Sequence, residues 1–492
     1  MTSPAVQAPA PTSAPAPRQP RHWRRGSAVR RGLAIAVMEG LVVAAMLGFV
    51  ESFIVPVLQT RLGASPSQIG LLTIIPLLGT VFTGIVLGRI IRWLGGNKRS
   101  VVLHALLQSL LIAGLSIPLH HPEQPWAVPL GLLLAVSIAL AGSIGGPAWI
   151  NWMGALVPRR IQSRYLAYRS RLVIVVKLGF ACLFAEILHL LPAEAGPWGL
   201  QALIAIAVVS RLMSSWMIHI QHEPPARPGA AAGGTDTINR PHATSFPMFL
   251  RTITRTDLGR WTLVWALLHF GVMLAGPYFA AYMLSAAPRG LGLSPGWTYV
   301  MLIQMAVLVR VAAFPLAGRL VDLFGPAATL RMAVVGIMVI PVAWALTTSI
   351  PILLLTEVIS GMCWCMAEVS VGVLLFTCHR DPHQRGYLIG YHQSVVNAVA
   401  VFGAIGGSVA LATHPDATGS LLPAIGDSDF HTLFLLSALF RLPAVILAMR
   451  FLPRLRALRA EESAGLWRMI PGTDLVLTVS RGLNGFFRRP EG

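Results

Sequence analysis

Charged residues are scarce in this chain of 492 residues. Asp, Glu, Lys and Arg make up 12% of it, against roughly 25% in soluble domains, and 55% of the residues are hydrophobic. This composition excludes an ordinary soluble globular domain. The sequence also holds few cysteines and no zinc motif, nucleotide-binding loop or catalytic-triad pattern. We therefore expect no disulfide scaffold, no enzyme activity and no bound cofactor.

Apolar runs of about 20 residues are present instead, and each can cross a hydrocarbon core of ~30 Å as a helix. Backbone polar groups in lipid must be satisfied within the segment, which favours helices over open strands. We predict an all-α membrane protein with twelve transmembrane helices, at about residues 33–58, 67–91, 101–119, 127–153, 170–191, 198–219, 261–284, 296–317, 328–346, 352–377, 387–412 and 430–451.

The connections between these runs carry most of the charge. The formal net charge is +19, and Lys and Arg gather in every second connection, as in GRIIRWLGGNKR at 88–99. The opposite connections, such as HHPEQP at 120–125, hold almost none, with Arg61 and Arg289 as exceptions. By the positive-inside rule, we expect a multi-pass protein of the inner membrane with both termini in the cytoplasm, and no nucleic-acid partner.

Five regions follow from these patterns. We expect a Pro/Ala-rich and then basic tail at 1–32, a six-helix half at 33–219, a cytoplasmic linker at 220–260, a second six-helix half at 261–451 and a basic tail at 452–492. We expect the protein to act as a monomer.

The two halves share matched segments in the same order. LGASP (Leu62–Pro66) recurs as LGLSP (Leu291–Pro295), and the basic connection at 88–99 recurs as GRLVDLFGPAATLR at 318–331. The chain thereby resembles the major facilitator superfamily over roughly residues 30–455. The resemblance implies a secondary transporter that works by alternating access, with its first, fourth, seventh and tenth helices lining a central cavity. Parallel repeats place the substrate path at their interface.

The signature of that family is Gly-x-x-x-Asp-x-x-Gly followed by basic residues, between the second and third helices, with an echo between the eighth and ninth. Its positions here are Gly88, Arg92 and Gly95 in the first copy, and Gly318, Asp322, Gly325 and Arg331 in the second. In the family, the acid of the first copy helps to lock the outward-facing state. Arg92 replaces that acid, which leaves Asp322 as the candidate for such a lock.

Charges inside the helices are costly in lipid and usually face a cavity or a partner. Glu368, Arg310 and Lys177 lie deepest, whereas Glu51 and Glu39 lie about two turns from a helix end. Burial and a nearby cation shift a carboxyl pKa in opposite directions, so a glutamate under both influences can exchange protons near neutral pH. We predict Glu368 as the coupling site, with Glu51 second. The alternative is a permanent ion pair of Glu368 with Arg310 or Lys177.

Other polar and aromatic residues have two interpretations each. Arg211 and Arg441 occupy matched positions near the cytoplasmic helix ends, where their side chains can reach water, and we predict a structural role for both. Aromatic walls with few polar groups suit an amphiphilic organic ligand, and helix packing is the alternative. The candidates for the cavity wall are Trp364, His269, Tyr278, Tyr282 and Asn151.

The soft ligands Met362, Cys363 and Cys365 would suit Cu(I), although the two cysteines lie about 200° apart around a helix. We predict a proton-coupled transporter of a small organic solute, with export favoured and no resident metal. The alternatives are uptake of a metabolite, copper transport, and a membrane sensor or assembly factor that does not transport.

Overall fold

The computed structural model describes residues 23–157, 162–191, 198–221, 245–379, 382–412 and 428–452. Residues 1–22 and 453–492, which belong to the predicted tails at 1–32 and 452–492, lie outside this part of the chain, as do residues 222–244 of the predicted linker. Each of the twelve predicted helix positions is helical within it. Several helix bounds differ from the prediction, and the first helix, which already begins at Trp23, differs most. A short helix, Phe246–Arg251, lies within the predicted linker.

The helices of the N-terminal half are α1 (Trp23–Pro56), which continues into a π-helical turn at Val57–Arg61, then α2 (Pro66–Ile69), α3 (Leu71–Trp93), α4 (Asn97–Gly114), α5 (Ser116–His120), α6 (Ala127–Leu156), α7 (Gln162–Leu190) and α8 (Trp198–Ile220). Those of the C-terminal half are α9 (Phe246–Arg251), α10 (Asp257–Ala275), a 3-10 turn at Gly276–Tyr278, α11 (Phe279–Leu284), α12 (Trp297–Phe324), α13 (Pro326–Leu346), α14 (Ile350–Thr377), α15 (Pro382–Ala410) and α16 (Asp429–Phe451).

Local sequence explains where several helices begin and end. Ser65 and Gln68 form a reciprocal capping box at the start of α2, with Pro66 at its first position. Gly95 and Gly325, which follow α3 and α12, have φ angles of 84° and 82°, a left-handed conformation that strains other residues. The predicted helix at 261–284 is interrupted at Gly276–Tyr278, because Pro277 has no backbone N–H to continue the ladder.

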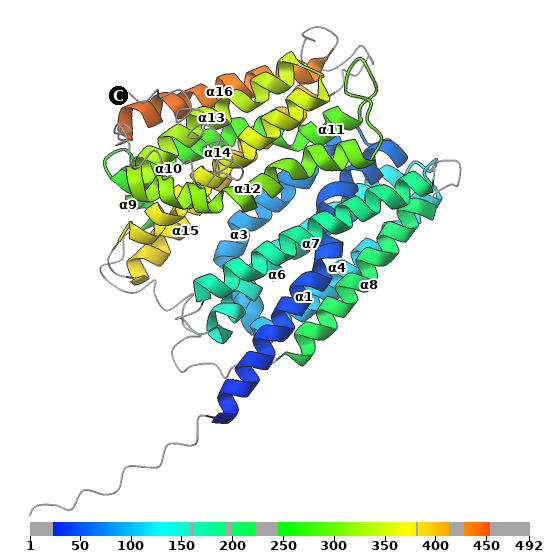
Figure 1. The fold of residues 1–492 in the computed structure, drawn as a ribbon, viewed down its shortest axis with the longest axis horizontal. Coiled ribbons are helices and arrows are strands. Elements are labelled where there is room, and N and C mark those ends of the chain that lie inside the picture. The colour runs from blue at the N-terminus through cyan, green and yellow to red at the C-terminus, as the bar shows by residue number, and fades with distance from the viewer. Residues whose placement is uncertain are drawn as a thin grey trace, which may run out of the picture.

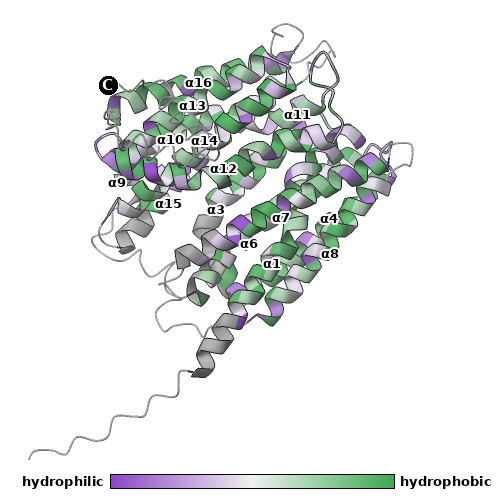
Figure 2. Ribbon diagram, in the orientation of Figure 1, coloured by the Kyte–Doolittle hydropathy of each residue, from purple (hydrophilic) through white to green (hydrophobic). Residues whose placement is uncertain are grey.

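Eleven helices in the described part of the chain are long and apolar enough to cross a membrane, and α3 occupies the remaining predicted position. Figure 2 shows hydrophobic residues along the lengths of these helices and hydrophilic residues mostly toward their ends. Large apolar side chains such as Leu110 and Ile446 are exposed on helix surfaces, which suits contact with lipid. The chain is therefore a multi-pass membrane protein.

The helix contacts follow the sequence repeat. In the N-terminal half α1 packs on α7 and α8, and in the C-terminal half α10 packs in the same way on α15 and α16. The contacts of α4 with α6 and α8 likewise recur as those of α13 with α14 and α16. The halves lie side by side and meet through α3 against α15 and α7 against α12, two contacts that the repeat also relates (Figure 1).

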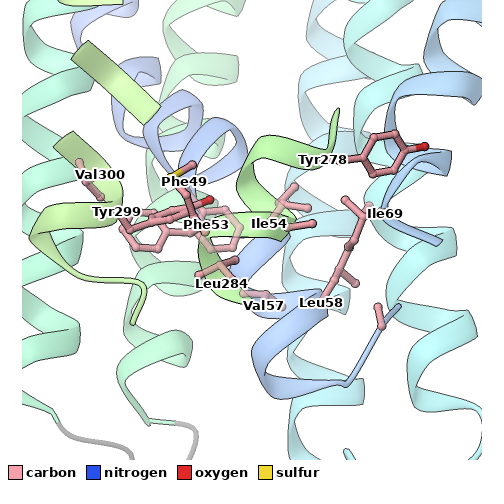
Figure 3. Close-up of a cluster of buried hydrophobic side chains, with 14 of the residues drawn as sticks. Phe49, Phe53, Ile54, Val57, Leu58, Ile69, Tyr278, Leu284, Tyr299 and Val300 are labelled. Carbon is pink, nitrogen blue, oxygen red and sulfur yellow. The ribbon is translucent and has the colours of Figure 1, made fainter. Parts of the chain in front are cut away.

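Among the described residues, the halves share a hydrophobic core at one end only. Phe49, Phe53 and Leu58 of the N-terminal half pack with Tyr278 and Tyr299 of the C-terminal half where α1 ends, as Figure 3 shows. Toward the beginning of α1 each half has a separate apolar cluster, and the ribbons of the two halves diverge (Figure 1). We call the end with the shared core the closed end.

Candidate functional site

Two ion pairs lie within the helices, one in each half. The Lys177 ammonium on α7 donates to Glu51 on α1, and the two side chains are 8% and 45% exposed. Arg310 Nη1 on α12 donates to Glu368 Oε1 on α14 at 2.7 Å, with exposures of 31% and 41%. Each pair joins two helices of the same half, and in each the glutamate is the more exposed partner.

Glycines allow the helices that carry these pairs to approach closely. A Cβ atom at Gly361 on α14 would lie 2.5 Å from the backbone oxygen of Ala306 on α12, so this crossing requires glycine. It lies two turns from Glu368 and brings α14 against the helix that holds Arg310. A Cβ atom at Gly48 on α1 would lie 3.1 Å from the backbone oxygen of Lys177, which makes the crossing beside the second pair similarly tight.

Glu39, the third acidic candidate, has a different environment. Its side chain is 4% exposed, and it accepts hydrogen bonds from Arg169 Nη2 and Ser214 Oγ, both at 2.7 Å. Arg211 in turn donates to Ser214 at 3.2 Å, and the Arg169 guanidinium lies 4.3 Å from the centre of the Trp149 ring. The carboxylate therefore binds α1 to α7 and α8 from inside the N-terminal half.

The aromatic candidates divide into two groups. Trp364 lies 5.8 Å from His269 and 5.7 Å from the Arg310 guanidinium, so these three side chains are close together. Tyr278 and Tyr282 are instead fully buried: the first donates to Ala404 O at 3.1 Å, and the second hydrogen bonds to His431 at 2.9 Å. Asn151 was also predicted to line the cavity, but its side chain lies outside the described part of the structure.

The two copies of the loop motif have similar backbones, since Gly95 and Gly325 are both left-handed. Arg331 donates to Leu452 O at 3.3 Å and thereby ties α13 to the end of α16. Asp322 is exposed and has no hydrogen bond or ion pair with the described residues. Gly318 and Gly88 lie on α12 and α3, and the Arg92 side chain lies outside the description. Among the described residues, Asp322 therefore has no partner for the predicted lock.

The sulfur atoms near Glu368 lie within helix packing. All four cysteines are free thiols, and Cys363 Sγ packs against Gly336 on α13. Cys363 and Cys365 are both buried in the apolar core of the C-terminal half. Among the described side chains no three His, Cys, Asp or Glu residues come together in a way that could hold a metal ion.

A cavity of about 280 Å³ lies inside the C-terminal half and was not predicted. Its polar lining includes Arg310 and Trp364, both predicted, and also Arg441, Glu357 and Ser360. The other lining residues are Val272, Gly276, Phe279, Met283, Leu302, Ile303, Ala306, Val307, Ile340 and Trp344. Arg441 is 3% exposed, so its side chain is buried and does not reach water, contrary to the prediction. The sequence signals for this site were the charges within the helices and the aromatic residue Trp364.

The model of the Major Facilitator Superfamily matches residues 40–404, and the chain belongs to this family of transporters. The predictions of the family and of the twelve-helix fold are thereby confirmed. No curated protein matches the chain in sequence.

Solved transporters share the fold. A point mutant of the nucleoside transporter NupG matches with a TM-score of 0.62 and 11% identity over 85% of this chain and 99% of its own. A bacterial metal transporter matches with a TM-score of 0.61 and 14% identity, over 86% of this chain and 98% of its own. The xylose transporter XylE from E. coli, in its inward-open conformation, matches with a TM-score of 0.58 and 15% identity, over 89% of this chain and 100% of its own. Their different cargoes agree with a fold that does not itself select a substrate.

Proposed function

We propose that the protein is a secondary active transporter that moves a small organic solute across the inner membrane by alternating access, coupled to protons and acting as a monomer. The observation that carries this proposal is the two ion pairs within the helices, Lys177 with Glu51 and Arg310 with Glu368. Both glutamates are partly exposed while each holds a cation. Protonation of either glutamate would release its cation, so one proton would change the charge that a half presents to the transport path.

The positive-inside rule supports an orientation with the beginning of α1 in the cytoplasm. In that orientation the shared hydrophobic core closes the periplasmic end, and the structure faces the cytoplasm. Contacts between the halves at the closed end include Gln304 with Ser52 at 2.8 Å and Trp297 with Glu186 at 2.8 Å. Alternating access then requires these contacts to break while the open end closes.

Export is the favoured direction. The cavity lining is rich in aromatic residues, with Phe279, Trp344 and Trp364, and has one acidic residue, Glu357. Such a wall suits an amphiphilic compound better than a strongly hydrated metabolite. Uptake of a metabolite is the alternative, and the direction of the proton gradient that drives accumulation distinguishes the two.

The test uses proteoliposomes and a panel of labelled aromatic acids, amines and neutral solutes. A proton gradient should drive the accumulation of at least one solute. Glu368→Gln should abolish this accumulation, whereas solute exchange without a gradient should persist, because exchange needs no net proton movement. Glu123→Gln, which changes an exposed acid outside the helices, is the matched control and should keep both activities.

Two outcomes contradict the proposal at different levels. Accumulation that depends equally on the gradient in native protein, Glu368→Gln and Glu51→Gln contradicts proton coupling through these ion pairs. A folded protein with no flux of any solute contradicts transport itself and favours the sensor alternative.

A further inference from the structure

Arg441 is a buried charge without an acidic partner. It lies in α16 and is 3% exposed; its Nη1 donates to the backbone oxygen of Ile337 at 2.6 Å, and its buried Nε has no hydrogen-bond partner. No carboxylate of the described residues lies within 4.0 Å of its guanidinium. An arginine cannot discard its proton, so this charge needs a counter-charge from elsewhere.

The cavity in the C-terminal half is where such a counter-charge can bind, since Arg441 forms part of its wall. Arg310 lies in the same wall, and its Nε is also buried without a partner. Arg310 is otherwise held by Glu368, so its own charge is balanced. Two guanidinium groups, each with a buried Nε that has no hydrogen-bond partner, therefore belong to the wall of the same cavity.

Glu357 is the one acid in this lining. It accepts a hydrogen bond from Trp344 Nε1 at 3.0 Å, and it forms no ion pair with either arginine. A buried carboxylate can be neutralised by a proton, whereas a guanidinium cannot. The permanent charge of the cavity is therefore positive.

We propose that this cavity binds the carboxylate of a small organic anion, with Arg441 as its main partner and Arg310 as its second. Fork-shaped guanidinium groups match the geometry of a carboxylate. The apolar part of the anion would contact Phe279 and Ile340 in the same lining. A volume of about 280 Å³ lies at the lower limit of ligand pockets and restricts the anion to a compact one. The inference rests on the proposed function, because this anion would be the transported solute.

The experiment compares phenylacetate with its neutral isostere phenylacetamide on the purified full-length protein, by titration calorimetry in a non-ionic detergent. Phenylacetate should bind roughly tenfold or more tightly than phenylacetamide, because a charge-assisted hydrogen bond is lost with the amide. Arg441→Gln should reduce the preference to about one. Arg211→Gln, at the matched position of the other half, should keep it.

Equal affinities for the acid and the amide in native protein overturn the proposal, and this result does not depend on any variant folding. Competition by chloride as strong as that by phenylacetate also overturns it, since the site would then take any anion. Arg441→Lys, which keeps the charge but loses the fork, should weaken phenylacetate binding severalfold.

Failure of this proposal and failure of the proposed function give different results. Gradient-driven flux of a neutral or cationic solute, with no preference for phenylacetate, overturns the anion site alone. Selective phenylacetate binding without gradient-driven flux supports the anion site and contradicts proton-coupled transport.

Discussion

Arg211 and Arg441 occupy matched positions in the two halves, yet their environments differ. Arg211 also has a buried Nε without a partner, but its Nη1 donates to Ser214, which donates to Glu39, and Glu39 also holds Arg169. Arg441 has a backbone carbonyl as its hydrogen-bond partner and borders a cavity. The N-terminal half balances its buried charge with its own side chains, whereas the C-terminal half leaves a positive charge for a ligand.

The difference has an identifiable source in the sequence. Glu39 precedes Arg211 by as many residues as His269 precedes Arg441, so a histidine occupies the position of the acid in the second half. Gly271, two residues further along α10, packs directly against Arg441. One replacement within a repeated framework thus converts an internal brace into a candidate binding site.

The largest expected effect is on stability, and it comes from removing the acid that balances the charges in the N-terminal half. Glu39→Gln keeps the shape of the side chain but leaves the charges of Arg169 and Arg211 without an acid. Removal of one partner of a buried ion pair costs about 3–5 kcal/mol, so we expect a fall of several degrees in the thermal unfolding midpoint and a poor yield of folded protein. The thermal unfolding midpoint of the purified variant, compared with that of the native protein, measures this loss of stability.

Arg441→Met is the matched test in the other half. It removes a buried charge that has no acidic partner, and replacement of such a charge by an apolar side chain is neutral or stabilising. A loss of stability as large as that of Glu39→Gln would show that the two arginines are balanced equally well, which contradicts the comparison.

The next effect concerns two glycines at matched positions, Gly361 on α14 and Gly131 on α6. A Cβ atom at Gly361 would meet the backbone of Ala306, which cannot move alone, whereas one at Gly131 would meet the tips of Leu58 and Leu62. We expect Gly361→Ala to destabilise by about 1–3 kcal/mol and Gly131→Ala by less, because flexible side chains can adjust. Equal unfolding midpoints of the two variants would contradict this difference.

A smaller effect is expected from a substitution that makes the C-terminal half resemble the N-terminal half. His269→Glu places an acid where the N-terminal half has Glu39, and it should supply Arg441 with a counter-charge. We expect phenylacetate affinity to fall about tenfold while the unfolding midpoint is kept or raised. Titration calorimetry measures the affinity, with His431→Gln as a control at another histidine hydrogen bond. Unchanged affinity would place the anion elsewhere.

The smallest effect concerns a contact between the halves at the closed end, rather than a difference between the halves. Trp297→Phe removes one hydrogen bond between α12 and Glu186 on α7, worth about 1 kcal/mol. The outward-facing population should rise severalfold, which labelling of an introduced cysteine near Gln59 would detect. Labelling at the native rate would show that this contact does not hold the closed end.

Much of the fold could be predicted because it depends on order along the chain. Hydropathy located each of the twelve helices, and the repeat of LGASP as LGLSP related the two halves, as the helix contacts show. The break in the seventh helix was missed, although Pro277 signals it, because the apolar pattern continues across it.

The candidate site could be predicted only in part. Depth in a helix singled out Glu368, Arg310 and Lys177, and the pairing of Glu368 with Arg310 was one of the predicted alternatives. Depth in a helix could not show that Glu39 forms an ion pair with Arg169, nor that Tyr278 and Tyr282 are buried in the closed end. Those facts depend on which faces of distant helices meet.

The sequence by itself determined that this chain spans a membrane, that its two halves repeat, and which charges lie within its helices, because hydropathy and spacing are properties of neighbouring residues. Only the tertiary structure decided which of those charges are balanced. The counter-charge of Arg211 comes from a helix far away in the chain, and Arg441 lacks one because His269 occupies the matched place. Electrostatic balance depends on distances between side chains, and packing alone sets those distances.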